Sequence, residues 1–286
     1  MKAPVFILGT QRSGTTLLTK VLSTHPKIFI KNELQVQNIF TPGVQKKDII
    51  ENIDKQIKTS FGKPIQELLW AEDKEEWGLK DPELTNYLPQ LEQFIPESKF
   101  IIIVRDGRGV VNSYKHNRWG LGTNAYTGTL RWLKEVTQQL EFMNKYPDNV
   151  IMIRYEDLVT DMESSIKLAC KHIGQDFTPE MLNYHNSKSH IKKTRENIHT
   201  NNKPDVQLSK KWLNELSKNE INIIETVAGD LLKKLGYNCV GHAVSLSSWK
   251  ILYFNLHQRI IGEIQLQYRW RLSKIKSYLR KKTKTP

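Results

Sequence analysis

Short, uninterrupted apolar runs alternate along the chain with stretches in which apolar residues recur every three or four positions. A run such as FIIIV has no polar alternation, which is typical of a parallel strand buried on both faces, whereas the wider spacing is typical of amphipathic helices. The alternation therefore predicts an α/β fold, with a parallel sheet flanked by helices. The strands are expected at residues 5–8, 27–30, 77–79, 100–104 and 150–153.

Proline residues and polar stretches mark where the expected helices end. Pro26, Pro96 and Pro147 each follow a stretch with helical periodicity. Residues 187–205 are polar and rich in Lys, Asn, His and Thr, which predicts a mobile loop. The helices are expected at residues 15–23, 47–59, 84–94, 109–115, 126–144, 162–173, 179–185, 209–216 and 220–235.

The first strand leads into a turn bounded by Gly9 and Gly14, within the segment PVFILGTQRSGTTLL that begins at residue 4. Such a turn between a strand and a helix aims backbone N–H groups and the positive end of the helix dipole at an anion such as phosphate. The nucleotide triphosphatase pattern requires Lys and then Ser or Thr after the second glycine, but here Thr15 and Thr16 follow it and the cation is Arg12. The segment predicts a P-loop-like phosphate site without kinase chemistry, unless the turn is only a tight connection.

A second strand, turn and helix follow in the segment KFIIIVRDGRGVVNS at residues 99–113. Arg105 ends the strand, Asp106 is a suitable helix N-cap, and Ser113 lies two helical turns further on, on the same side. Arg105 and Ser113 can hold a second phosphate by charge and by hydroxyl, or the segment is only a helix start with a surface arginine. Two such turns favour a ligand, because open α/β sheets bind ligands at the carboxyl edge of their strands.

Together these segments resemble the sulfotransferases that use 3′-phosphoadenosine 5′-phosphosulfate (PAPS), and most closely the branch that contains the tyrosylprotein sulfotransferases. The resemblance covers roughly residues 4–237. It implies a sulfotransferase fold in a domain at residues 1–242. The resemblance does not extend to residues 243–286, which the pattern of the sequence predicts to be a basic amphipathic helical tail. The motifs that carry it are RSGTTLL at 12–18, HP at 25–26, Glu33, KDP at 80–82, SKF-x₃-VRDGR at 98–108, YE at 155–156 and LGY at 235–237.

The resemblance also implies a role for individual residues. Glu33 would be the catalytic base, Lys80 would stabilise the transition state, and Arg12 would lie beside the sulfuryl group. Arg105 and Ser113 would hold the 3′-phosphate. Sulfuryl transfer, like phosphoryl transfer, has a loose transition state, so a proton acceptor and fixed cations are the groups it needs. The other donor-binding residues implied are Ser13, Gly14, Thr15, Thr16, Tyr155 and Lys211.

The acceptor is implied only as a hydroxyl, on a peptide tyrosine or on a carbohydrate. Where the animal tyrosyl enzymes have two arginines for acidic peptides, this chain has Gln35 and Ile39. Thr194 and Thr200 are the nearest candidates for the stabilising serine of the family. No metal is expected, because the histidines and carboxylates form no cluster with the spacing of metal ligands.

Most of the positive charge belongs to the C-terminal segment. The net charge is +13, and residues 249–286 hold ten Lys or Arg against a single acid. Phe254, Ile261, Tyr268 and Ile275 recur every seven residues, which predicts an amphipathic helix with a basic opposite side. This helix can pack on the body of the protein or on a second copy, lie on an anionic membrane surface, or bind an acidic partner.

The sequence favours a soluble cytoplasmic protein, with peripheral contact at the inner membrane face as an alternative. No apolar run approaches the ~20 residues of a membrane span, and the N-terminus does not resemble a secretory signal. Cys170 and Cys239 are too few for a disulfide framework. The body is only mildly basic, so no nucleic-acid partner is expected. Beside the PAPS-dependent sulfotransferase, two hypotheses stay open: a nucleotide kinase, and a non-catalytic nucleotide-responsive module that docks through its tail.

Overall fold

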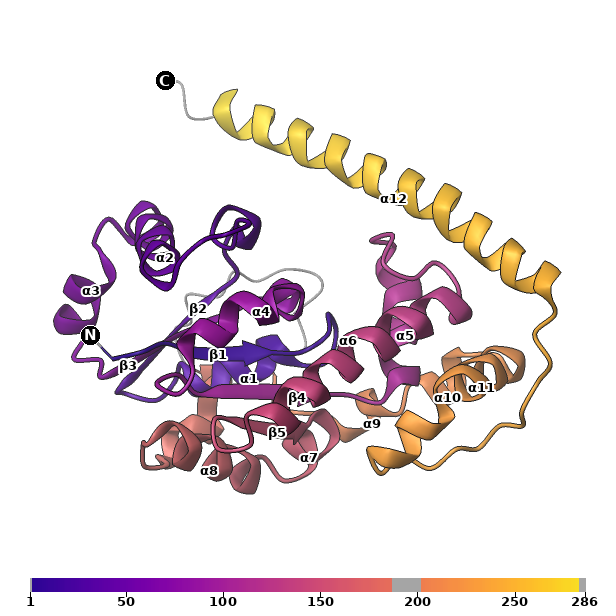
Figure 1. Cartoon of the computed structure of the whole chain (residues 1–286), viewed down its shortest axis with the longest axis horizontal. Coiled ribbons are helices and arrows are strands. Elements are labelled where there is room, and N and C mark those ends of the chain that lie inside the picture. Colours follow the sequence, from indigo (N-terminus) through magenta and orange to yellow (C-terminus); the bar gives the residue numbers. More distant parts are fainter. Residues whose placement is uncertain (1, 187–201, 283–286) are drawn as a thin grey trace. The chain divides into compact units, whose positions relative to one another are not determined.

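The computed structural model describes residues 2–186 and 202–282, with side chains up to residue 272 (Figure 1). Thr194 and Thr200, and most of the loop predicted at residues 187–205, lie outside the described residues. The chain divides into two compact units. The first unit consists of Met1–Arg105 and Glu135–Ser209, and the second consists of Asp106–Lys134 and Lys210–Pro286. The predicted domain boundary at residue 242 stays a prediction.

Five strands form one sheet in the first unit, in the order β2-β3-β1-β4-β5, and every neighbouring pair is parallel. The parallel sheet predicted from the apolar runs is therefore confirmed. Three strands extend one or two residues into polar positions, because the ladder of backbone hydrogen bonds continues there regardless of the side chain. The strands are β1 (Val5–Leu8), β2 (Ile28–Asn32), β3 (Glu76–Lys80), β4 (Phe100–Val104) and β5 (Val150–Arg154).

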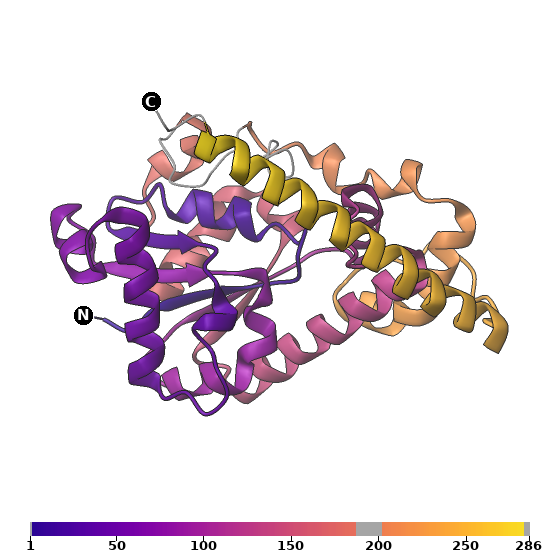
Figure 2. The same ribbon diagram turned by 90° about the horizontal axis from the view of Figure 1, so that it is seen from above.

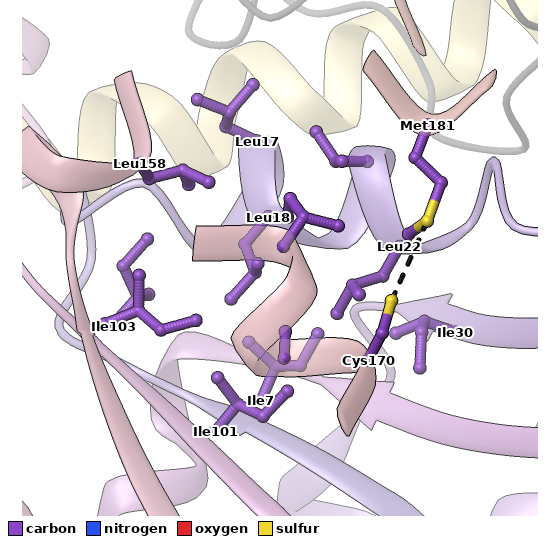
Figure 3. Packing of buried hydrophobic residues seen from close by; sticks show 14 of the residues in the cluster. Ile7, Leu17, Leu18, Leu22, Ile30, Ile101, Ile103, Leu158, Cys170 and Met181 are labelled. Atoms are coloured by element: carbon purple, nitrogen blue, oxygen red, sulfur yellow. Dashed lines mark hydrogen bonds between the residues drawn. The ribbon is translucent and has the colours of Figure 1, made fainter. Parts of the chain in front are cut away.

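One face of the sheet is covered by α1, α7, α8 and the 3₁₀ segment η4, as the buried cluster in Figure 3 shows. Ile7, Ile101 and Ile103 point from the strands toward Leu18 and Leu22 of α1. Cys170 of α8 is fully buried there, with its sulfur 3.8 Å from that of Met181, so this cysteine is a core residue. The helical segments are α1 (Thr15–Leu22), α7 (Tyr155–Thr160), α8 (Met162–Ile173) and η4 (Pro179–Asn186).

Aromatic rings fill the opposite face. Phe6 of β1 stacks on Phe100 of β4 and meets the edge of Phe94, with ring centroids 5.2 Å apart in both pairs. Phe142 then packs edge-on against Phe100. Because successive residues of a strand point to opposite faces, Phe6 and Ile7 bury against different layers, as expected for a sheet covered on both sides.

The helix predicted at residues 84–94 is wrong as a single element. The chain there forms three short segments, η2 (Pro82–Tyr87), α4 (Leu88–Leu91) and η3 (Glu92–Phe94). Pro89 lies at the start of α4, where its missing N–H costs nothing, but it cannot continue a helix from the preceding turn. The other helical segments of this unit are η1 (Val36–Asn38), α2 (Lys46–Phe61), α3 (Ile65–Ala71) and α9 (Val206–Ser209), and α6 (Ala125–Lys145) belongs to both units.

The second unit has its own core, in which Trp212, Ile224 and Val111 are buried and Phe254 packs against them. The helix predicted at residues 209–216 is present only as a shorter helix, because α9 ends at Ser209 and the next helix begins at Trp212. The helix α12 is continuous over its 35 residues in both views (Figures 1 and 2). The helices of this unit are α5 (Gly107–Asn117), α10 (Trp212–Glu215), α11 (Lys218–Lys234) and α12 (Ser248–Lys282).

Candidate functional site

The carboxyl ends of all five strands meet at one edge of the sheet, and each supplies a candidate residue. Parallel strands bring these ends together even where the residues are far apart in the sequence. The residues that follow or end the strands there are the Gly9–Gly14 turn (β1), Glu33 (β2), Lys80 (β3), Arg105 (β4) and Tyr155 (β5). The first unit therefore gathers most of the residues that the sequence singled out.

The turn after β1 is held by its own hydrogen bonds. The backbone N–H of Ser13 donates to the carbonyl of Thr10 over 3.1 Å, and the buried Ser13 hydroxyl donates to the same carbonyl over 2.7 Å. The residue before α1 is Gly14, which has no side chain with which to cap the helix, and the first i→i−4 bond is donated by Leu18. The N–H groups of Thr15 and Thr16 therefore have no intrahelical acceptor, and they are available to bind an anion at the start of α1.

Glycine is required at position 14 for two reasons. Its φ of 102° lies in the left-handed region, where a side chain is strained, and a Cβ atom there would run into the ring of Tyr155. The ring thus packs directly against the backbone of the turn. Arg12 also has a positive φ, of 72°, although it is not glycine. Such backbone strain persists only where the surrounding structure holds it.

Glu33 and Lys80 form an ion pair at the ends of β2 and β3. The Lys80 Nζ atom lies 2.8 Å from the Glu33 carboxylate and 3.4 Å from the Thr16 hydroxyl. The backbone of Glu33 is also fixed, because its N–H donates to the carbonyl of Lys80 over 2.8 Å. The three side chains form a row from an acid, through a cation, to the anion-binding turn.

The two members of this ion pair differ in their exposure to solvent. The Lys80 side chain is fully buried, whereas 56% of the Glu33 side chain is exposed. Glu33 has a φ of 55°, a value that is uncommon for a residue with a side chain. The strained backbone aims an exposed carboxylate outward from a buried lysine, so the carboxylate can meet a molecule from solvent while the lysine stays beside the turn.

Arg105 joins the turn to the neighbouring segments. Its guanidinium donates to the carbonyl of Arg12 and to the carbonyl of Leu208, each over 3.2 Å, and lies 4.6 Å from the centre of the Tyr155 ring. Burial raises the pKa of the Tyr155 hydroxyl, and the charge of Arg105 partly offsets this rise. The arginine holds the strained backbone of Arg12 and stacks on the Tyr155 ring, while burial keeps the Tyr155 hydroxyl neutral.

Asp81 is a buried carboxyl directly after Lys80. It caps η2 by accepting the N–H of Glu83 over 2.8 Å. Burial raises the pKa of Asp81 to about 6, against the lowering by this hydrogen bond and by the charge of Lys80. The motif KDP contains Asp81, but the sequence carries no sign of its burial or of its altered pKa.

Ser113 and Lys211 lie in the second unit. The Ser113 hydroxyl on α5 accepts a hydrogen bond of 3.0 Å from Asn117, and Lys211 is exposed at the start of α10. Asp106 caps α5, as predicted, by accepting the N–H of Arg108. Arg105 belongs to the first unit, so the clamp of Arg105 and Ser113 on a 3′-phosphate stays a prediction, and so does the role of Lys211.

The amide contacts around Gln35, two residues after Glu33, were not predicted from the sequence. The Gln56 amide bonds the backbone of Gln35 twice, over 2.9 and 3.1 Å, and the Asn38 amide donates to the Gln35 side chain over 2.8 Å. Gln56 lies on α2, 21 residues after Gln35. No pattern in the sequence links these positions, since only the packing of α2 brings them together.

Within residues 2–186 and 202–282, no three His, Cys, Asp or Glu side chains gather as metal ligands would. The expectation that the reaction needs no metal stays a prediction. Among the described helices, none combines the length and the apolar character needed to cross a membrane.

Comparison with known proteins identifies a family and a fold. The model of the sulfotransferase family matches residues 4–179. Protein-tyrosine sulfotransferase 2 from Gallus gallus is 25% identical over 263 residues, which cover 82% of this chain and 69% of the relative. The sulfotransferase domain from the curacin biosynthetic pathway has a TM-score of 0.60 at 21% identity, covering 84% of this chain and 99% of that domain. A mouse sulfotransferase complexed with PAP has a TM-score of 0.53 at 15% identity. The match covers 82% of this chain and 85% of the mouse protein.

Proposed function

Because the chain belongs to the sulfotransferase family, we propose that it transfers the sulfuryl group of PAPS to the hydroxyl of a peptide tyrosine or of a carbohydrate. The observation that carries this proposal is the row of Glu33, Lys80 and Thr16, which connects an exposed acid to an anion-binding turn. Membership of this enzyme family leaves the nucleotide kinase and the non-catalytic module without support.

The first unit offers a fitting cradle for the phosphosulfate of the donor. The N–H groups at the start of α1 attract an anion, and no side chain of the N-cap residue competes for them, because that residue is Gly14. Lys80 and Arg12 add positive charge at the same turn. In this proposal Ser13, Gly14, Thr15 and Thr16 hold the 5′-phosphosulfate, and Arg105, Ser113, Tyr155 and Lys211 bind the rest of the nucleotide.

Glu33 acts as the general base on the acceptor. Its carboxylate takes the hydroxyl proton as the acceptor oxygen bonds to sulfur, while the bond from sulfur to the bridging phosphate oxygen breaks. That oxygen leaves with the electron pair, and the buried ammonium of Lys80 stabilises the charge that grows on it. The Lys80 ammonium can contact both the Glu33 carboxylate and the leaving phosphate, because it lies between Glu33 and Thr16.

The surroundings of Glu33 favour an acceptor that is recognised by neutral hydrogen bonds. Gln35 and Asn38 follow Glu33 closely in the chain with exposed amide side chains, and the Gln56 amide holds the backbone of Gln35. An amide can donate to and accept from a hydroxyl, whereas a carboxylate-rich peptide is recognised best by arginine. Within the proposal, a carbohydrate hydroxyl therefore fits this side of the site better than a strongly acidic tyrosine peptide.

The test uses PAPS with radiolabelled sulfur and two series of acceptors, tyrosine peptides of increasing acidity and neutral or amino-sugar oligosaccharides. We expect labelled product from the wild type, and a loss of about 10²–10⁴-fold in turnover for Glu33→Gln, with donor affinity nearly unchanged. A base acts on the acceptor, so its loss leaves the donor contacts in place.

Glu97→Gln is the matched control for this variant. Glu97 pairs with Lys46 over 3.0 Å, and its side chain is 56% exposed, the same fraction as for Glu33. The control should keep the turnover of the wild type. Near-normal turnover of Glu33→Gln when chemistry limits the rate would rule out Glu33 as the base, and failure of every acceptor in the presence of bound donor would contradict the proposed acceptor classes.

A further inference from the structure

The helix α12 is attached to its own unit mainly through polar side chains. The Gln258 amide donates to the carbonyl of Gly120 over 2.6 Å and accepts the N–H of Thr123 over 2.8 Å. Gln265 accepts the N–H of Gly120 over 3.0 Å. A Cβ atom at Gly120 would lie 2.8 Å from the carbonyl oxygen of Gly262, so a glycine is needed where the helix meets this loop.

The apolar contacts on this inner face are concentrated near the beginning of the helix. Phe254 stacks on Tyr126 with ring centroids 5.6 Å apart, and further along the guanidinium of Arg269 lies 4.1 Å from the centre of the Trp119 ring. The seven-residue repeat predicted that Phe254, Ile261 and Tyr268 share one apolar face of the helix. In the structure Phe254 packs against the core of this unit, whereas Tyr268 is mostly exposed, because such a repeat drifts around a straight helix by about 20° per heptad.

Large apolar side chains line the outer face instead. They are spaced three or four residues apart, so they form one stripe along more than four turns of the helix. Each of them is between 47% and 81% exposed. The residues of this outer stripe are Trp249, Leu252, Tyr253, Leu256, Ile260 and Ile264. A helix of a globular protein normally turns its apolar stripe toward the core, so this orientation indicates that the stripe has another apolar surface to meet.

The charge of the segment indicates which surface that is. Residues 249–286 carry ten Lys or Arg and one acid. Two copies of such a helix would bring like charges together, which opposes pairing through the stripe, whereas an anionic surface attracts it. Trp249 and Tyr253 at the beginning of the stripe are residues whose apolar body and polar tip suit the boundary between water and lipid.

We propose that α12 is a membrane-docking helix, which lies flat on an anionic lipid surface with the outer stripe inserted among the acyl chains and the basic side chains at the headgroups. This goes beyond the proposed sulfuryl transfer and does not depend on it. The helix is attached by Gln258 and Gln265 on one side and is apolar on the other, so docking requires no detachment from its unit. Basic charge attracts it to the headgroups and apolar insertion holds it there.

Co-sedimentation of the full chain with vesicles tests this inference. The vesicles contain about 30% phosphatidylserine in phosphatidylcholine, or phosphatidylcholine alone, at low salt and at about 0.15 M salt. We expect binding to the anionic vesicles that weakens with salt, and little binding to the neutral ones. The double variant Leu256→Glu/Ile260→Glu should bind the anionic vesicles about tenfold or more weakly, because two apolar contacts become charged ones.

Trp70→Glu/Leu168→Glu is the matched control. It makes the same change of net charge at two exposed apolar positions on α3 and α8, and Leu168 at 47% exposed closely matches Leu256 at 48%. Since the altered side chains of both variants are exposed, their melting temperatures should stay near that of the wild type. The single variant Trp249→Ser, which adds no charge, should also weaken binding.

Four outcomes would overturn the inference. The first is that the wild type does not bind the anionic vesicles. The second is that the two double variants lose vesicle binding equally, which would indicate an effect of net charge alone. The third is that the Leu256→Glu/Ile260→Glu protein binds the anionic vesicles as well as the wild type. The fourth is a lipid-free dimer that this variant converts to a monomer, without vesicle binding by the wild type, which would assign the stripe to a second copy.

Discussion

Replacing Lys80 by methionine separates the catalytic role of this residue from its structural role. The Lys80 side chain is fully buried and touches only two polar groups that the structure describes, the Glu33 carboxylate and the Thr16 hydroxyl. Methionine has nearly the same length and volume, so it fills the same space and removes only the charge.

The expected effect on turnover is large. A fixed cation that meets the developing charge on a leaving oxygen contributes roughly as much as an oxyanion-hole donor, about 2.7–4 kcal/mol, or 10²–10³-fold in kcat. The expected effect on stability is small. Loss of one partner from a fully buried ion pair costs about 3–5 kcal/mol, but Glu33 is more than half exposed and water can solvate its carboxylate. The free energy of unfolding should therefore change by no more than about 1 kcal/mol.

The assay compares kcat under donor saturation with the free energy of unfolding from urea titration, for Lys80→Met and for Lys46→Met. Lys46 is the control because it also pairs with an exposed glutamate, Glu97, but it lies at the start of α2 and is itself partly exposed. The control should change neither quantity. Two results would refute the reasoning: a kcat within a few-fold of the wild type, or a loss of several kcal/mol in stability, which would make Lys80 a structural residue.

Two further predictions concern donor binding and pH. Adenosine 3′,5′-bisphosphate at about a hundredfold excess over its Kd should stabilise the wild type by about 2.7 kcal/mol. The Arg105→Ala variant should lose most of the resulting shift in Tm, because a charge-assisted contact is removed. If the shift in Tm is unchanged in this variant, the 3′-phosphate binds elsewhere. Burial raises the pKa of Asp81 from 3.8 to about 6, so the native state binds this proton more tightly than the unfolded chain does. The free energy of unfolding should therefore fall by about 2–3 kcal/mol as the pH rises from about 4 through 6. Asp81→Asn should remove that part of the pH dependence in urea titrations, and parallel curves for the two proteins would contradict it.

Local features of this protein could be predicted from the sequence. The apolar runs at Val5–Leu8 and Phe100–Val104 are strands with those same bounds, because a strand buried on both faces leaves no room for polar side chains. The turn at Gly9–Gly14 precedes a helix as expected, since its glycines and the following periodicity are adjacent in the chain. The sequence predicted one helix at residues 84–94, where the structure has three short helical segments. Small differences in free energy decide where a short helix ends.

The assembly of the site was decided by tertiary structure. Glu33, Lys80 and Thr16 could be named through the family resemblance, but Lys80 is 47 residues from Glu33 and 64 from Thr16 along the chain. They meet only because β3 pairs with β2 on one side and with β1 on the other. The strand order depends on how the whole sheet packs, and no local pattern specifies it.

For α12, too, the sequence determined some properties and the tertiary structure decided others. The sequence determined that the tail is helical and basic, because these properties follow from spacing and composition. The side of the helix opposite Phe254, which was expected to be basic, carries the outer stripe instead. Which side faces inward was decided by the backbone of Gly120, whose carbonyl accepts a hydrogen bond from Gln258 and whose N–H donates one to Gln265. In a sequence, glutamine is expected to face solvent. Gln258 and Gln265 face inward here because the folded chain brings backbone hydrogen-bond partners close to them.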